Sequence, residues 1–238
     1  MVEIPSHPRL AGALLHANRY GCVQEVLTIV AMLEEASSLF YRPKEQKVHA
    51  DSARQRFTHK EGGDHLTLMN VYNAWVETEY SIPWCKENFV QHRSLQRARL
   101  VREQLEALCD RVEIPSDSSV GAADHVPILK ALLAGYFSNT ATLTRDGQHY
   151  RTLRSNMTVR IHPSSVLAAQ EQAYKPKVVM YHELVITSSD WMRGVAPIEA
   201  TWLSEVAPHF WKAAEVDKLN VIKKKMPKGQ GVSAGGKF

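Results

Sequence analysis

The sequence lacks the patterns that mark zinc-binding, disulfide-rich, secreted or membrane-spanning proteins. Its three cysteines, Cys22, Cys85 and Cys109, are far apart and form no CxxC pair, so neither a zinc site nor a disulfide framework is predicted. We therefore expect a reducing compartment. No apolar run approaches the ~18 residues that a membrane helix needs. The N-terminus does not have the pattern of a signal peptide.

Motifs for catalysis are also missing. None of the eleven histidines lies in an HExxH motif, and no His/Cys cluster has the spacing of metal ligands. A GxxxxGK pattern at Gly231–Lys237 is followed by Phe238 instead of Ser or Thr, so we interpret it as a coincidence. No DExH box is visible, and nothing indicates a nucleophile with an ordered base. The sequence thus predicts no catalytic residue, no bound cofactor and no metal.

Positive charge is concentrated at the end of the chain. The protein has 238 residues with 29 Lys and Arg against 25 Asp and Glu, and six of the lysines lie from Lys218 to Phe238, where there is no acid. The residues before Lys218 therefore carry a slight excess of negative charge. It follows that only local basic patches, and not the net charge, can be used to argue for nucleic-acid binding. Residues 218–238 are predicted to be a basic, disordered tail.

Apolar residues recur at helical spacing through the first half of the chain. Helices are predicted over Arg9–Tyr20, Gly21–Leu33 and Ser94–Val112. Another begins after the breaker Gly62-Gly63, and Asp64 is expected to be its N-cap. We therefore assign residues 1–114 to a helical domain.

The hydrophobic period changes from helical to strand-like after a short polar linker, residues 115–124. A helix from about Val126 to Phe137 is followed by five alternating segments, at 140–144, 150–153, 157–161, 178–187 and 191–198. Five short strands with one helical insert, at 164–173, are typical of a small Greek-key barrel of the OB type. A last helix is predicted over Glu199–Val206. The predicted fold class is therefore α+β, with the five-stranded OB-type barrel in residues 125–217.

Arginines on the helix at 94–112 are the first candidate contact with nucleic acid. Arg93, Arg97, Arg99 and Arg102 lie off its apolar stripe. They either pair with acids, as Arg99 would with Glu103 at i+4, or form a row that faces phosphates. The sequence leaves both interpretations open.

A second basic patch lies in the predicted barrel. From Arg145 to Lys177 there are six lysines and arginines against two acids, interleaved with Tyr150 and with histidines. An OB barrel binds single strands by combining a basic groove with flat side chains on which bases stack. Strand alternation puts Arg160 on the opposite face from the apolar Ile161, so it points away from the core. This pattern favours single-stranded nucleic acid as a ligand.

Several blocks of the sequence resemble DEAH-box RNA helicases. GGDHLTLMNVYNAW (Gly62–Trp75) and WCKENFVQHRSLQRARLVREQL (Trp84–Leu105) resemble the ratchet-like domain of that family and the helix pair that follows. The blocks that resemble its closing OB-fold are AGYFSNTATL (134–143), VRIHPSSVL (159–167), VVMYHELVITSSDWMRGV (178–195) and WLSEVAPHFW (202–211). Within the family, Tyr41–Phe57 and Lys223–Lys228 look most like the spliceosomal ATPase that acts before the first splicing step.

The resemblance implies that these two domains form one wall of an RNA tunnel. On the ratchet helix it suggests Arg93 and Arg97 as RNA contacts. On the barrel, the residues expected to line the path where RNA enters or leaves are Arg151, Arg154, Arg160 and His162. Ser164 and Ser165 are expected to donate hydrogen bonds to phosphate from the N-terminus of the short helix after Pro163.

The resemblance also sets expectations about partners. The RecA-like motor domains of the family, where ATP and Mg²⁺ bind, are absent from this sequence, so we expect an excised RNA-binding and regulatory region without catalysis. The implied partners are single-stranded RNA (pre-mRNA), the motor domains of the same protein and spliceosomal proteins, in the nucleus and without a membrane. The alternative is a protein-docking scaffold for spliceosomal partners with no direct RNA contact. Charge reversal at Arg154 and Arg160 separates the two.

Overall fold

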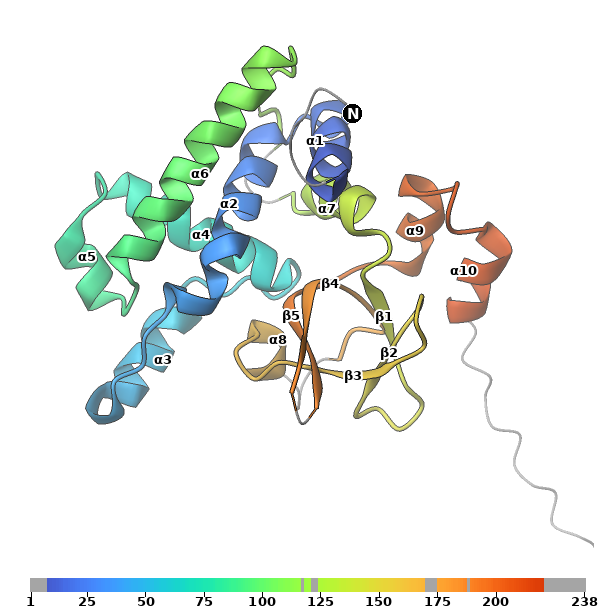
Figure 1. Cartoon of the computed structure of the whole chain (residues 1–238). Helices are drawn as coiled ribbons and strands as arrows, with labels where there is room; N and C mark the ends of the chain where they lie inside the picture. Colours follow the sequence, from blue (N-terminus) through green and yellow to red (C-terminus); the bar gives the residue numbers. More distant parts are fainter. Residues whose placement is uncertain (1–7, 117, 121–123, 170–174, 188, 221–238) are drawn as a thin grey trace, which may run out of the picture.

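The chain forms a helical part and a closed β-barrel (Figure 1). The computed structural model describes residues 8–116, 118–120, 124–169, 175–187 and 189–220. The α+β class and the barrel predicted from the sequence are confirmed. The GxxxxGK pattern, and the predicted tail from residue 221 on, lie outside the described residues. Across the described residues, no helix combines the length and the apolar character needed to span a bilayer.

The helical part is built around α2, which is buried along most of its length. Its helices are α1 (Pro8–Tyr20), α2 (Val23–Leu39), α3 (Lys47–Gln55), α4 (Gly63–Glu77), α5 (Ile82–Glu87) and α6 (His92–Arg111). The short 3₁₀ turn η1 (Lys44–Gln46) precedes α3. Helix α2 packs against both α4 and α6. Its middle section, Val26–Leu33, is therefore apolar except for Thr28, as a helix segment covered on several sides must be.

Local signals explain how some of these helices begin. Helix α5 starts after Ser81, whose hydroxyl accepts the backbone N–H of Trp84 at 3.3 Å, with Pro83 in its first turn. Helix α4 departs from the prediction. Its N-cap is Gly62 and no side chain caps it, because Asp64 lies inside the first turn and is buried against the barrel. The expected N-cap is therefore wrong, and the carboxylate serves tertiary contacts instead.

The barrel has strands β1 (Thr140–Leu143), β2 (Tyr150–Thr152), β3 (Thr158–Ile161), β4 (Val178–Ile186) and β5 (Asp190–Pro197). They close in the order β1-β2-β3-β5-β4, antiparallel except for the parallel pair β3–β5. The inward residues form a separate small core that includes Tyr150, Val159, Val179 and Met192. Alternation thus works as expected, since Arg151 and Arg160 are exposed while their strand neighbours are buried.

Helix α7 (Val126–Tyr136) joins the two parts. It follows the predicted linker, yet it packs against α1 and contributes to the core of the helical part. The close approach depends on Gly12 and Gly135, since a Cβ on Gly135 would collide with the backbone of α1. Barrel residues Met180 and Ala196 belong to the same core. The packing therefore does not divide at residues 115–124, and the predicted domain limits stay a prediction.

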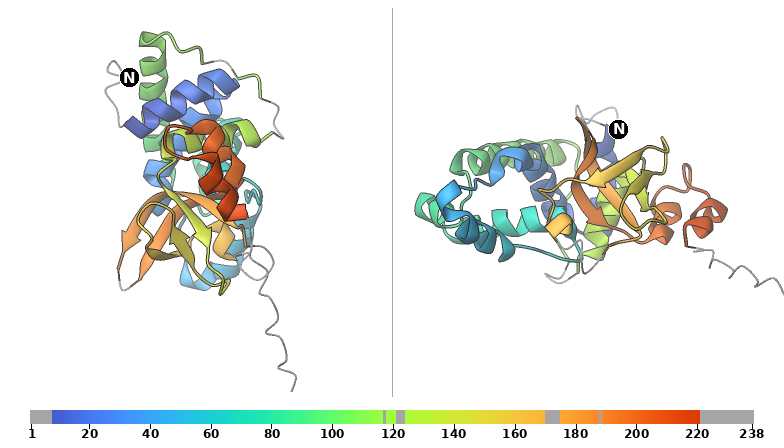
Figure 2. Two further views of the ribbon diagram at one scale, coloured as in Figure 1. Left: turned by 90° about the vertical axis from the view of Figure 1, so that its right-hand side faces the viewer. Right: turned by 90° about the horizontal axis from the view of Figure 1, so that it is seen from below.

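Within the described residues, two helices follow the barrel. The predicted final helix is α9 (Ala200–Val206), and α10 (Ala213–Asn220) comes after it. Seen from below, the helical part lies on one side of the barrel and α9 and α10 on the other (Figure 2). Lys218–Asn220, expected in the disordered tail, are helical because Val216 and Leu219 pack on the core. That part of the tail prediction is wrong.

Candidate nucleic-acid interface

A basic groove of about 580 Å³ runs over the barrel beside β3 and β5. Its lining residues are Gln148, His149, Arg160, Ile161, Pro163, Ala168, Lys175 and Trp191, and none of these is acidic. The parallel pairing of β3 and β5 places Arg160 directly opposite Trp191. Registered partners point to the same face of a sheet. The fold therefore brings a guanidinium and an indole together on the outer surface, although they are distant in sequence.

Arg160 is oriented by a short relay from the β1–β2 loop. Its guanidinium lies 2.9 Å from Nε2 of His149, and Nδ1 of that ring lies 3.0 Å from Asp146. Because a guanidinium only donates, Nε2 must accept, and Nδ1–H must then donate to the carboxylate. The Thr144 hydroxyl and the backbone N–H of Gln148 hold the pKa of Asp146 well below its ordinary value. The ionised Asp146 thus fixes the ring that positions Arg160.

Trp191 is the functional candidate that sequence reasoning missed. It lies in a predicted strand, but it was not included among the RNA-binding residues. Its neighbour Met192 is fully buried, so alternation turns Trp191 outward, where its ring meets His162 edge-on at 5.9 Å. An outward tryptophan beside basic residues is the signal that could have found it, since such rings stack on bases.

The other predicted barrel residues do not gather in this groove. Arg151 and Arg154 are exposed elsewhere on the barrel. His162 borders the groove through Trp191, and its Nδ1 lies 2.7 Å from the Ser164 hydroxyl. Burial, aided by Arg193, lowers the pKa of His162, which favours the neutral ring.

Ser165 occupies a different environment from its neighbour Ser164. It is buried, and its hydroxyl accepts the N–H of Leu167 at 3.2 Å and helps to lower the pKa of Asp64. The helix expected over 164–173 is described only as α8 (Val166–Ala169), since residues 170–174 lie outside the described part. A phosphate contact by Ser165 stays a prediction, and this enclosed hydroxyl does not favour it.

A second hollow, of about 260 Å³, separates the helical part from the barrel. Arg54 enters it from α3, lies over the ring of Phe40 at 4.5 Å and donates to the carbonyl of Ser164. On the barrel side it is lined by His162, His182 and Arg193. The two arginines of this hollow are balanced by the acids Glu34, Asp64 and Glu183. The hollow therefore lacks the uniform positive charge that attracts a phosphate chain. The groove is therefore the better nucleic-acid site.

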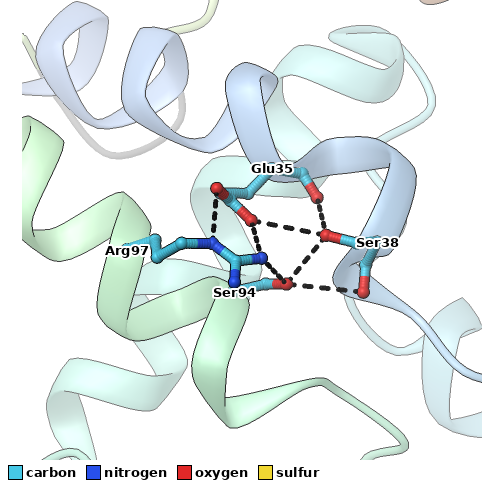
Figure 3. A network of polar contacts seen from close by, with 4 residues as sticks. All are labelled: Glu35, Ser38, Ser94 and Arg97. Carbon is cyan, nitrogen blue, oxygen red and sulfur yellow. Dashed lines mark hydrogen bonds and ion pairs between the residues drawn. The ribbon is translucent and has the colours of Figure 1, made fainter.

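The predicted arginine row on α6 is largely used within the helical part. Arg97 donates from Nε and Nη2 to the two carboxylate oxygens of Glu35, at 2.8 and 2.6 Å (Figure 3). Ser38 and Ser94 complete this network, their hydroxyls 2.9 Å apart. The ion pairs of Arg99 with Glu103 and of Arg102 with Glu106 form as the i+4 spacing predicts. Arg97 therefore joins α6 to α2 instead of facing solvent alone.

Arg93 differs from Arg97 on the same helix. It is exposed, and no hydrogen bond or ion pair links it to another residue in the described part of the chain. Of the two predicted ratchet-helix contacts, Arg93 is the one whose charge remains available to a phosphate.

The Arg97–Glu35 pair predicts a specific pH dependence. The Arg97 hydrogen bond lowers the pKa of Glu35 from its ordinary value of 4.5. A depressed carboxylate pKa stabilises the fold above the ordinary value, and the contribution is lost as pH falls through the lowered one. We expect Arg97→Met to destabilise the protein at about pH 7, and to do so progressively less as the pH falls below the ordinary pKa of 4.5. Urea unfolding over this range measures the difference, with Arg93→Met as the matched control. A loss for Arg97→Met that does not change with pH would contradict the assignment.

Two protein-family models match this chain. Residues 7–68 match the helicase associated domain (HA2), ratchet-like, and residues 128–210 match an oligonucleotide/oligosaccharide-binding (OB)-fold. The first match covers α1 to the beginning of α4. The second covers the barrel, most of α7 and all of α9. The order of the two matches agrees with the order of the helical part and the barrel.

Proposed function

We propose that this chain binds single-stranded RNA in the barrel groove. The chain carries the ratchet-like and OB-fold domains of the C-terminal region of DEAH/RHA-type helicases. The observation that carries the proposal is the pairing of Trp191 with Arg160 across β3 and β5. Lys175 lies on the same rim, held by a 2.7 Å hydrogen bond to the carbonyl of Gly147. A flat ring between positive charges fits a base and its flanking phosphates.

The chemistry of the groove favours binding without strong sequence preference. Arg160 and Lys175 offer donors to phosphate oxygens, which every nucleotide carries, and Trp191 offers a face on which any base stacks. Binding should therefore depend strongly on salt. In the helicase, this surface is one wall of the RNA tunnel, past which the ATP- and Mg²⁺-dependent motor domains move the strand.

The finer assignment is to pre-mRNA splicing in the nucleus. It is supported by the resemblance of Tyr41–Phe57 and Lys223–Lys228 to the spliceosomal ATPase that acts before the first step. The RNA would then be pre-mRNA, and the protein partners would be the motor domains and spliceosomal proteins. Crosslinking of the chain to RNA, with and without the motor domains added, would map this path residue by residue.

Charge reversal in the groove tests the RNA function. We expect Arg160→Glu to weaken binding of a fluorescent single-stranded RNA about tenfold at low salt and to reduce the slope of log K against log salt by about 0.7, the value for one phosphate contact on a single strand. Fluorescence anisotropy over a salt series measures both. Arg154→Glu should have a smaller effect, because Arg154 lies outside the groove, and Arg19→Glu on α1 should have none. Equal affinity of Arg160→Glu and wild type would reject RNA binding at this site.

A protein-docking function is the second candidate. Large apolar side chains are exposed on the helical part, among them Leu100 and Ile82, which are 58% and 50% exposed. Exposed apolar side chains favour contact with a partner protein where they form a contiguous patch. If Arg160→Glu leaves RNA binding unchanged while Leu100→Glu abolishes recruitment of a spliceosomal protein, the docking function is supported instead.

A further inference from the structure

One buried carboxylate connects the helical part to the barrel. Asp64 lies in the first turn of α4 and is buried, with 9% of its surface exposed. The backbone N–H of Val166 donates to its Oδ1 at 2.8 Å, and the backbone N–H of Val195 donates to its Oδ2 at 2.8 Å. The hydroxyl of Ser165 acts on it as well and helps to lower its pKa. Both carboxylate oxygens are therefore occupied, and the two backbone donors come from the barrel side.

The two segments held by Asp64 are those that build the groove. Val166 begins α8, directly after the loop that contains Pro163, and Val195 lies in β5, the strand that contains Trp191. Pro163 and Trp191 both line the groove, and so does Ala168 of α8. A single side chain of the helical part thus holds one wall from β5 and another from the β3–α8 loop.

The surroundings of Asp64 leave little freedom in its contact with the barrel. Burial raises the pKa of Asp64, whereas the N–H donors of Val195 and Val166 and the charge of Arg54 act in the opposite direction. The backbone at Gly63 approaches β5 so closely that a Cβ there would lie 2.8 Å from Cα of Ala196. Because a buried carboxylate is tolerated only when its oxygens accept hydrogen bonds, α4 and the barrel must stay in register at this point.

We propose that Asp64 is a positioning residue for the RNA-binding groove: it clamps β5 and the β3–α8 loop to α4, and so fixes the spacing between Trp191 and Pro163. The proposal rests on the proposed RNA function of the groove. It adds that the helical part sets the geometry of an RNA site that, among the described residues, is lined only by side chains of the barrel part.

Asp64→Asn tests the clamp in the whole chain. The amide offers one acceptor oxygen, so its NH₂ group must face one of the two backbone N–H donors. We expect hydrogen–deuterium exchange in segments 162–169 and 190–197 to rise about tenfold, while exchange in α6 is unchanged. The dissociation constant for single-stranded RNA should also rise about tenfold.

Thr67→Val is the matched control. Thr67 is buried one turn further along α4, and its hydroxyl bonds to the carbonyl of Gly63 at 2.8 Å and to the N–H of His59 at 3.0 Å, both inside the helical part. We expect it to lower stability without changing exchange in the two segments or RNA affinity. If it weakens RNA binding as much as Asp64→Asn does, Asp64 acts through general stability and the proposal is overturned.

The outcomes separate the clamp from the RNA function. Unchanged exchange in both segments of Asp64→Asn would overturn the clamp, whatever the RNA affinity. If exchange is faster in Asp64→Asn but the wild-type protein does not bind RNA, the clamp is supported and the groove is rejected as an RNA site. If Asp64→Asn does not fold, Ser165→Ala removes the hydroxyl that acts on Asp64 from the same segment, and a smaller rise in exchange at 162–169 is expected. No rise in that variant would overturn the proposal.

Discussion

Trp191→Ala should weaken single-stranded RNA binding about 5-fold to 150-fold, because stacking of one base on an aromatic side chain contributes about 1–3 kcal/mol. The loss should be the same in oligonucleotides of different sequence, since every base has a π-face. Trp191→Phe keeps a flat ring in the groove and should retain most of the affinity. Fluorescence anisotropy at constant low salt measures all three proteins.

Trp202→Ala is the matched control for this prediction. Trp202 is also a partly exposed tryptophan beside a cation, with Nζ of Lys130 5.6 Å from its ring, but it lies on α9 and outside the groove. Its removal should leave RNA affinity unchanged. The same loss of affinity in both variants would show that tryptophan removal acts through the fold, and no loss in either would remove Trp191 from the site.

Gly63→Ala should destabilise the protein more than Gly147→Ala, although both glycines have a positive φ. Gly63 has φ of +60°, and a Cβ there would meet the carbonyl oxygen of Val195 and lie 2.8 Å from Cα of Ala196. A left-handed backbone costs an L-residue about 1–2 kcal/mol. Collision with a packed backbone adds about 1–3 kcal/mol, because neither β5 nor α4 can move freely.

Gly147→Ala separates the two contributions. Gly147 has a similar φ of +68°, but a Cβ there would have no atom within 4 Å. Both variants lose backbone freedom in the same way, so the difference between their free energies of unfolding reports the collision alone. Urea unfolding measures it, and we expect Gly63→Ala to lose about 1–3 kcal/mol more than Gly147→Ala. Equal losses would mean that α4 and β5 are not in close contact.

The sequence determined the elements whose signals are local. Alternation was enough to place the five strands and to turn Arg160 outward, because the pleat forces neighbouring side chains onto opposite faces. The i+4 spacing allowed the pair of Arg99 with Glu103, which was one of the two interpretations that the sequence left open. These features depend only on residues within one turn or one strand.

The tertiary structure decided the contacts between segments that are distant in the chain. Asp64 has the position of a good N-cap, yet its partners Val166 and Val195 lie 102 and 131 residues further on. Trp191 became a candidate only when the parallel pairing of β3 and β5 set it opposite Arg160. Helix α10 forms in a segment whose hydrophobic periodicity is weak, because Val216 is buried there. Propensity and periodicity report on a chain's near neighbours, whereas these three outcomes depend on which distant groups burial brings together.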